Sequence, residues 1–246
     1  MTMQVNGEAG RVAMISGASR GIGLAIAKRL MAEGYRLSLG VRHDTAGLPP
    51  APIAALATGN ADRVWVSPYE ATDRAAPGAW VQRTVEHFGR LDVLVNNAGI
   101  LRVVDIEEDQ EEWLDELWEV NVKAPLRLIR HAFPHLRASG TGRIINMVSL
   151  SGQRVMGRAV GYAMSKAALL AMTHTARHAG WNDGVRATAV CPGWVNTDMT
   201  EDVVALPHKE MTQPDDIASS VAMLLSLPNN ASVAEFNVNC RLESKF

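Results

Sequence analysis

The stretch from Val12 to Glu33, which reads VAMISGASRGIGLAIAKRLMAE, predicts a buried strand, a glycine-rich turn and a helix in succession. Val12 to Ser16 is a short apolar run, and apolar side chains recur at helical spacing from Ile22 until Gly34, a typical helix stop. The glycines at positions 17, 21 and 23 let backbone N–H groups approach a phosphate, which the dipole at a helix N-terminus attracts. Their spacing, G-x-x-x-G-x-G, differs from the usual dinucleotide fingerprint but still predicts a pyrophosphate-binding loop.

Strand-like and helical segments alternate along the rest of the chain. Such alternation is typical of βαβ units, which build a parallel sheet with helices on both faces. No linker interrupts the pattern, so we expect a single domain over residues 1–246 with an α/β fold, a Rossmann-like, doubly wound parallel β-sheet. Further strands are expected at residues 36–41, 63–67, 91–95, 143–148, 186–190 and 236–239, and helices at 80–88, 111–136 with interruptions near Pro125 and Pro134, 160–178 and 215–227.

The composition is that of an ordinary globular protein, with 246 residues of which 47% are hydrophobic. The 24 Lys and Arg and the 26 Asp and Glu give a net charge of −2, which excludes a broad basic surface for nucleic acid or anionic lipid. No uninterrupted apolar run approaches the ~18 residues of a membrane span, and residues 1–11 do not resemble a secretory signal. Cys191, Cys240 and seven scattered histidines lack metal-ligand spacing, so we expect no metal site and a cytoplasmic protein.

Four polar residues in the middle of the chain predict a proton-transfer site. Tyr162 and Lys166 are four residues apart on an expected helix, so they share one face. A lysine ammonium close to a phenol stabilises the phenolate and lowers the tyrosine pKa from its ordinary ~10, which makes the tyrosine a usable acid and base near neutral pH. Ser149 ends an expected strand at the sheet edge where parallel folds bind ligands, and Asn121 lies in a helical stretch that leads into the same region.

Several motifs occur together and in one order, and through them the chain resembles the short-chain dehydrogenase/reductase family in its single-domain form. The resemblance runs from about residue 11 to 199 and again from 213 to 239. Each motif alone is weak, whereas their joint order and structural context are specific. The motifs are Ser16-Gly17-Ala18-Ser19-Arg20-Gly21-Ile22-Gly23, Asn96-Asn97-Ala98-Gly99, Asn121, Ser149, Tyr162-Ala163-Met164-Ser165-Lys166 and Pro192-Gly193-Trp194-Val195-Asn196-Thr197.

The resemblance implies a role for each of the four polar residues. Tyr162 exchanges a proton with the substrate oxygen, Lys166 lowers the tyrosine pKa and binds the nicotinamide ribose, Ser149 orients the carbonyl, and Asn121 holds a water that links Lys166 to solvent. It also implies that 97–99 line the adenosine side of the cofactor, and that Val195 and Thr197 meet the carboxamide. The expected cofactor-binding residues are Gly17, Ser19, Arg20, Gly21, Ile22, Gly23, Arg42, Glu70, Ala71, Asn97, Ala98, Gly99, Tyr162, Lys166, Pro192, Gly193, Val195 and Thr197.

The chain departs from the family pattern in several places. Ser16 stands where the family usually has Thr, and Glu70 is the nearest match to an Asp that usually reaches the adenine. The end of the last strand, 237–241, lacks the usual paired glycines. The segment 200–213 is shorter than the substrate-covering segment of many relatives, and its Pro and polar residues favour an exposed loop. We therefore expect an open active site, with Trp194 as one wall and broad tolerance for bulky carbonyl compounds.

The end of the second strand bears on the choice of nicotinamide cofactor. NAD enzymes of this kind place an acidic residue there to hold the ribose 2′-OH, and that position is Val41 in this chain. Arg42 follows it and Arg20 lies in the glycine-rich loop, and two guanidinium groups suit a 2′-phosphate. We expect NADP(H) to be preferred, with NAD(H) possible if Asp44 serves as the acidic partner.

On this basis the expected function is hydride transfer between NADP(H) and a carbonyl/secondary alcohol pair. An NAD-dependent alcohol dehydrogenase, a non-catalytic dinucleotide sensor on the same fold and an S-adenosylmethionine methyltransferase are the alternatives, and the last gives no purpose to Tyr162 and Lys166. Arg154 and Arg158 are either solvent-exposed or attract an acidic substrate. An apolar substrate pocket is expected from Leu101, Leu150, Val155, Met156 and Trp194.

The apolar surface of residues 105–136 predicts an oligomer. Trp113 and Trp118 lie on a helix that packs against a second subunit in the family, and burial in an interface accounts for both without a ligand. We expect a homodimer or homotetramer held mainly by apolar area.

Overall fold

The computed structural model describes residues 10–42, 47–154, 157–203 and 205–242. Within these ranges one sheet of seven parallel strands has the order β3-β2-β1-β4-β5-β6-β7, which confirms the expected α/β, doubly wound fold. The strand order reverses between β1 and β4, and ligands of such sheets bind at the carboxyl ends of the strands beside this switch. The strands are β1 Val12–Ser16, β2 Arg36–Val41, β3 Val64–Pro68, β4 Val93–Asn96, β5 Arg143–Met147, β6 Arg186–Pro192 and β7 Glu235–Val238.

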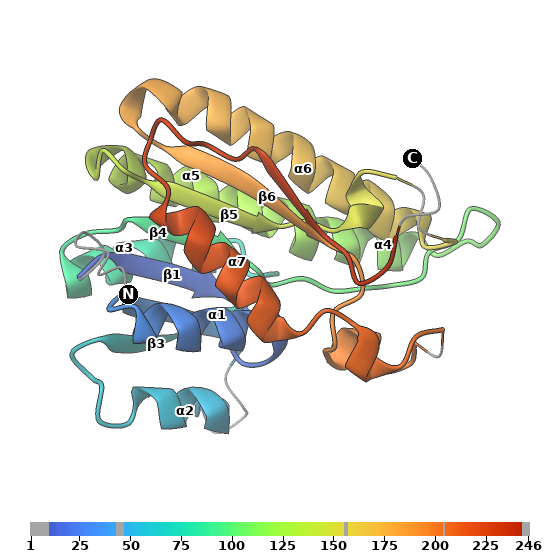
Figure 1. Ribbon diagram of the computed structural model, residues 1–246, viewed down its shortest axis with the longest axis horizontal. Helices are drawn as coiled ribbons and strands as arrows, with labels where there is room; N and C mark the ends of the chain where they lie inside the picture. Colours follow the sequence, from blue (N-terminus) through green and yellow to red (C-terminus); the bar gives the residue numbers. More distant parts are fainter. Residues whose placement is uncertain (1–9, 43–46, 155–156, 204, 243–246) are drawn as a thin grey trace.

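Helices cover both faces of the sheet, with α1, α2 and α7 on one side and α3, α5 and α6 on the other (Figure 1). The long helix α6 carries Tyr162 and Lys166 and reaches the carboxyl ends of β5 and β6. The helices are α1 Gly21–Ala32, α2 Ala51–Ala57, α3 Ala76–Phe88, α4 Glu111–Trp118, α5 Ala124–Ala138, α6 Val160–Gly180 and α7 Pro214–Ser226.

Strand β1 explains why the central strands are apolar along their whole length. Ala13 and Ile15 belong to the apolar cluster that α1 and α7 complete, whereas Val12 and Met14 belong to the cluster on the α3 and α5 side. All four side chains are fully buried. A strand covered on both faces has no solvent-exposed side, so the alternation of a half-exposed strand disappears.

Two local expectations differ from the structure. Helix α2 lies in a Pro- and Ala-rich stretch for which the sequence pattern predicts no element, and Ile53 alone is buried within it. The interruption expected near Pro134 is wrong, because Pro134 lies inside α5, where Ala132 and Leu136 on either side are fully buried and hold the helix by packing. The actual interruption is a π-helical turn at Glu119–Lys123, just before Pro125.

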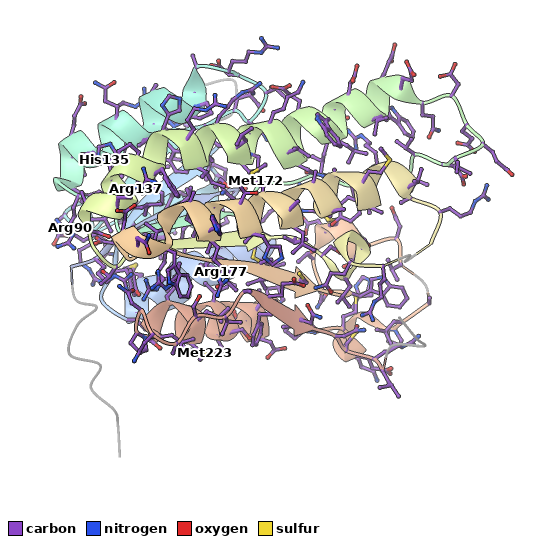
Figure 2. The ribbon with its side chains drawn as sticks, turned by 90° about the horizontal axis from the view of Figure 1, so that it is seen from above. Arg90, His135, Arg137, Met172, Arg177 and Met223 are labelled. Atoms are coloured by element: carbon purple, nitrogen blue, oxygen red, sulfur yellow. The ribbon has the colours of Figure 1, made fainter. Side chains whose placement is uncertain are left out.

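The opposite end of the sheet, where the strands begin, carries the labelled Arg90, His135 and Arg137 (Figure 2). Arg90 pairs with the buried Asp92, and Arg137 pairs with Asp183. The positive charges of both arginines are thus matched by carboxylates. No helix in the described part of the chain is long and apolar enough to cross a membrane.

Candidate active site

The glycine-rich turn between β1 and α1 is packed so closely that side chains do not fit. Gly17 has a φ of +65°, and a Cβ there would lie 2.8 Å from the Cα of Ala98. A Cβ on Gly23 would lie 2.3 Å from the carbonyl oxygen of Gly17. Because a Cβ is excluded at both positions, the turn keeps the tight backbone cradle that a pyrophosphate needs.

Residues after β4 hold this cradle in shape. The side-chain amide of Asn97 donates hydrogen bonds of 3.0 Å to the carbonyl oxygens of both Ser16 and Gly17. The hydroxyl of Ser16 accepts the backbone N–H groups of Asn97 and Ala98, each at 3.0 Å. Ser16 therefore supplies a hydroxyl where the family usually has threonine. Ser16, which is not among the expected cofactor-binding residues, thus stabilises the shape of the turn through these hydrogen bonds.

The amino end of α1 suits an anion. Its first turn has no acidic residue, so its free N–H groups and dipole face a phosphate without repulsion. Thr197 reaches this turn from the loop after β6, since a Cβ on Gly21 would lie 3.2 Å from the Cγ2 of Thr197. Arg20 forms an ion pair of 2.8 Å with Asp198. The cradle and the helix end together fit the diphosphate of a nicotinamide dinucleotide.

Tyr162, Ser149 and Lys166 meet at the carboxyl end of β5. The hydroxyl of Ser149 is hydrogen-bonded to the phenol of Tyr162 and lies 3.4 Å from the carbonyl oxygen of Pro192, at the end of β6. The Nζ of Lys166 is 5.6 Å from the centre of the Tyr162 ring and donates a 2.8 Å hydrogen bond to the carbonyl oxygen of Met147. The fold thus brings three of the four expected catalytic residues together.

Asn121 completes the group from the π-helical turn, a distortion that is frequent at functional sites. Its amide nitrogen donates to the carbonyl oxygen of Ile100 at 3.0 Å and to the hydroxyl of Ser165 at 3.1 Å. Gly99 lies between Asn121 and the lysine, because a Cβ there would be 3.2 Å from the Oδ1 of Asn121 and 3.5 Å from the Nζ of Lys166. Ser165 is not among the expected site residues. Its position directly before Lys166 is the sequence signal by which it could have been identified.

Burial sets the pKa values of the central pair. It raises the pKa of Tyr162 to about 12, with the hydrogen bond from Ser149 acting in the opposite direction. Burial also lowers the pKa of Lys166 to about 8. The expectation that the lysine lowers the tyrosine pKa is therefore not met in this structure. Desolvation disfavours the Tyr162 phenolate, and the Lys166 ammonium is directed to the carbonyl of Met147.

The expected adenosine end lies beside a pocket of about 450 Å³ at the carboxyl ends of β2 and β3. Val41, at the position where NAD enzymes place an acid, is buried, and Ala71 is also buried. Asp44 lies outside the described residues. The walls of the pocket thus include two expected cofactor residues, Arg42 and Glu70, and residues at the start of α3. It is lined by Arg42, Pro68, Tyr69, Glu70, Asp73, Ala75, Ala76, Ala79 and Arg83.

The loop after β6 carries the remaining expected cofactor residues. Pro192 ends β6, and Gly193 follows it beside the side chain of Asn239, whose Oδ1 would lie 2.4 Å from a Cβ on Gly193. Val195 is buried and fixed by a bridge to Thr212. Ser19 and Ile22 are half-buried in the glycine-rich turn.

The expected substrate side is the segment that follows Trp194. In place of an α-helix, the described part of residues 198–213 forms two short 3₁₀ turns, Asp198–Thr200 and His208–Glu210. Arg241 near the carboxyl end of the chain donates to the carbonyl oxygen of Ala205 at 3.0 Å, and its guanidinium lies 5.7 Å from the centre of the Trp194 ring. The C-terminal segment therefore holds this loop.

Other residues expected near the substrate have different places. Leu150 is fully buried in a small apolar cluster and does not line an open pocket, whereas Leu101 is exposed. Arg158 pairs with Asp105 and lies 4.0 Å from Glu107, so its charge is already matched. Arg154 is half-buried. Val155 and Met156 lie outside the described residues.

The comparisons with known proteins agree with this geometry. A family model described as short chain dehydrogenase matches residues 11–206. The chain is 41% identical over 238 residues to an agropine synthesis reductase of Rhizobium rhizogenes, covering 95% of this chain and 53% of that protein. It thus spans about half the length of that relative.

Solved structures resemble the whole described fold. An alcohol dehydrogenase from Thermococcus sibiricus, complexed with 5-hydroxy-NADP, has a TM-score of 0.84 and 31% identity, covering 95% of this chain and 99% of that one. A blue fluorescent protein from a metagenomic library, in complex with NADPH, has a TM-score of 0.82 and 30% identity, covering 94% and 96%. The chain belongs to the short-chain dehydrogenase family.

Proposed function

We propose that this protein transfers a hydride between NADP(H) and a carbonyl/secondary alcohol pair, with Tyr162 as the general acid and base. The observation that carries the proposal is the meeting of Tyr162, Ser149 and Lys166 at the carboxyl end of β5, with Asn121 beside them. These groups lie on the sheet edge that also bears the glycine cradle. A protein that only senses a dinucleotide has no need of all four side chains.

A reduced nicotinamide, when bound in the glycine cradle, would supply the hydride for reduction of the carbonyl carbon. The hydroxyl of Ser149 holds the carbonyl oxygen in place, and the phenol of Tyr162 donates its proton to that oxygen as negative charge develops there. The charge of Lys166 stabilises the resulting phenolate, which takes up a proton again before the next turnover. In the direction of oxidation, the phenolate of Tyr162 accepts the proton of the alcohol.

The high pKa of Tyr162 suits its role as proton donor in the direction of reduction. At neutral pH a phenol with a pKa of about 12 is fully protonated and ready to donate. Lys166, with a pKa of about 8, is mostly protonated at pH 7 and carries the charge that the phenolate needs. The Nζ and the ring are 5.6 Å apart, so a small shift of the lysine strengthens this interaction.

Tyr162→Phe tests the chemistry. Turnover should fall by at least about 10²-fold while the cofactor still binds, because the ring remains and only the transferable proton is removed. The measurement is the absorbance of the reduced cofactor with a panel of ketones, aldehydes, sugars and secondary alcohols. Tyr35→Phe is the matched control, since it removes a buried tyrosine hydroxyl, which accepts from the Nη1 of Arg11 at 3.4 Å, at the opposite end of the sheet where β2 begins. Near-normal turnover in Tyr162→Phe would contradict the proposal.

Preference for NADP(H) rests on Arg42. Its side chain lines the pocket at the ends of β2 and β3, and the neighbouring position where an acid would hold an NAD ribose is the buried Val41. A charge-assisted hydrogen bond contributes about 1.5–3 kcal/mol, so Arg42→Ala should weaken NADPH by about one to two decades more than NADH. Arg29→Ala, which removes an exposed arginine in the last turn of α1, controls for the change in net charge. Tighter binding of NADH by the unmodified protein would reverse the assignment.

We also propose that two copies associate through the surface of α4 and α5. Trp113 on α4 and Leu126 on α5 are exposed to 44% and 41%. Burial of these side chains against a second copy removes them from water. Light scattering should give a dimer or tetramer at micromolar concentration, and a single species of 26.6 kDa would contradict this.

A further inference from the structure

The ion pair between Arg20 and Asp198 joins the two loops that flank the cofactor cradle. Arg20 lies in the glycine-rich turn directly before α1, and Asp198 directly follows Thr197 in the loop after β6. The Nη1 of Arg20 is 2.8 Å from the Oδ2 of Asp198, although 178 residues separate them along the chain. The ion pair with Asp198 therefore engages the guanidinium of Arg20, a residue that is expected to bind the cofactor.

The backbone, and not only the two long side chains, brings this pair together. Gly21 and Thr197 lie close together, because a Cβ added to Gly21 would be 3.2 Å from the Cγ2 of Thr197. Asp198 begins a 3₁₀ turn that is fixed by a capping box, in which the hydroxyl of Thr200 accepts the N–H of Thr197 at 3.2 Å and donates to the carbonyl of Val195 at 2.6 Å. Asp198 is thus held beside the glycine-rich turn.

The pair is weak enough to be exchanged. The side chains of Arg20 and Asp198 are 69% and 59% exposed, and water and salt screen an ion pair of this kind. The hydrogen bond to the carboxylate comes from Nη1 of the guanidinium. A phosphate monoester carries more charge than a carboxylate and has three acceptor oxygens, which the fork of an arginine can grip through two nitrogens.

We propose that Asp198 is a specificity-determining residue, which competes with the 2′-phosphate of NADP(H) for the guanidinium of Arg20. This inference rests on the proposed use of NADP(H). Binding of NADP(H) through Arg20 breaks the pair with Asp198, whereas NAD(H) has no 2′-phosphate and leaves the pair intact. Asp198 therefore weakens NADP(H) binding and narrows the difference in affinity between the two cofactors.

A double-mutant cycle tests the competition, with the dissociation constants of NADPH and NADH measured by fluorescence titration at low salt. Asp198→Asn should tighten NADPH by about two- to five-fold, the range expected for an exposed ion pair, and should change NADH by less than about 1.5-fold. Arg20→Gln should weaken NADPH. In the Arg20→Gln background the Asp198→Asn change should have no effect on NADPH, because the guanidinium for which both groups compete is gone.

Asp202→Asn is the matched control, since it removes an exposed carboxylate four residues further along the same segment. If this variant tightens NADPH as much as Asp198→Asn does, general charge is responsible and the inference is overturned. Weaker binding of both cofactors to Asp198→Asn would also overturn the inference. That result would mean that the ion pair between Arg20 and Asp198 stabilises the bound cofactor and does not compete with it. A preference of the unmodified protein for NADPH, combined with an unchanged Asp198→Asn variant, would reject the competition alone and leave the proposed function standing.

Discussion

The cofactor cradle and the substrate-side loop are neighbours at one sheet edge but are built in different ways. In the cradle, backbone lies against backbone, and a Cβ on Gly17 or Gly23 would fall within 2.8 Å of another residue's atoms. The substrate-side loop has only two 3₁₀ turns and is tied to the C-terminal segment by side chains such as Arg241. Tight backbone contact leaves no room for substitution, whereas a loop held by exposed side chains can vary without loss of the fold.

The largest effect is expected in the cradle, from Gly23→Ala. The added methyl would lie 2.3 Å from the carbonyl oxygen of Gly17 and 2.5 Å from the amide nitrogen of Asn97. The free energy of unfolding should fall by about 1–3 kcal/mol, and cofactor affinity by about 10²-fold or more, because the phosphate-binding N–H groups are displaced. Denaturant unfolding and titration with NADPH measure the two effects.

Gly59→Ala is the control for this prediction. Gly59 has a φ of +74°, but a Cβ there would meet nothing within 4 Å. The substitution should lower stability by about 1–2 kcal/mol through backbone strain and leave cofactor affinity unchanged. Equal cofactor affinity in Gly23→Ala and the parent would show that the cradle is more adaptable than its packing indicates.

Lys166 lies where the two regions meet, and its burial links activity to stability. The unfolded chain holds the lysine proton up to pH 10.5, whereas the folded pKa is about 8, so stability rises with pH between these values. Lys166→Met removes the buried charge. The variant should be more stable than the parent below pH 8 by about 1–2 kcal/mol, and this gain should shrink toward pH 10.5. Its turnover should fall by at least about 10²-fold.

Denaturant unfolding of both proteins at pH 7 and pH 10 measures the change in this difference. Lys123→Met is the control, because Lys123 is 45% exposed on its side chain and pairs with Glu119 at the surface. Its effect on stability should be small and similar at the two pH values. A stability gain of Lys166→Met that did not vary with pH would contradict the assignment of the effect to proton binding.

The smallest effect is expected on the substrate side, from Arg241→Ala. The change removes the hydrogen bond to Ala205 and the contact with the Trp194 ring, each worth about 0.5–1 kcal/mol at an exposed site. KM should rise about two- to five-fold for bulky ketones, with kcat nearly unchanged, because the loop positions the substrate but takes no part in proton transfer. Kinetics with ketones of increasing size, with Arg29→Ala as the control, measure this split.

Such a series also tests whether the open loop gives broad tolerance for bulky substrates. Activity confined to one small ketone would contradict the expectation of an open site. An effect of Arg241→Ala on kcat as large as that of Lys166→Met would show that the two regions are not independent.

The sequence by itself determined the elements and the order of the motifs. The apolar run at 12–16, the glycine spacing at 17, 21 and 23, and the helical pattern of 160–178 were readable because strand and helix periodicities are local properties of the chain. Helix α2 was missed because its alanines and prolines give no clear apolar stripe, and Pro134 was misjudged because packing on both sides outweighed its local preference.

Only the tertiary structure decided how the site residues meet and what their surroundings do to them. The sequence indicated that Lys166 lowers the pKa of Tyr162, but burial dominates and raises it to about 12. The meeting of Arg20 with Asp198, and of Arg241 with Trp194, joins parts of the chain that no local pattern connects. Desolvation and long-range contacts depend on the packing of the whole molecule, so neither has a signature within a short stretch of sequence.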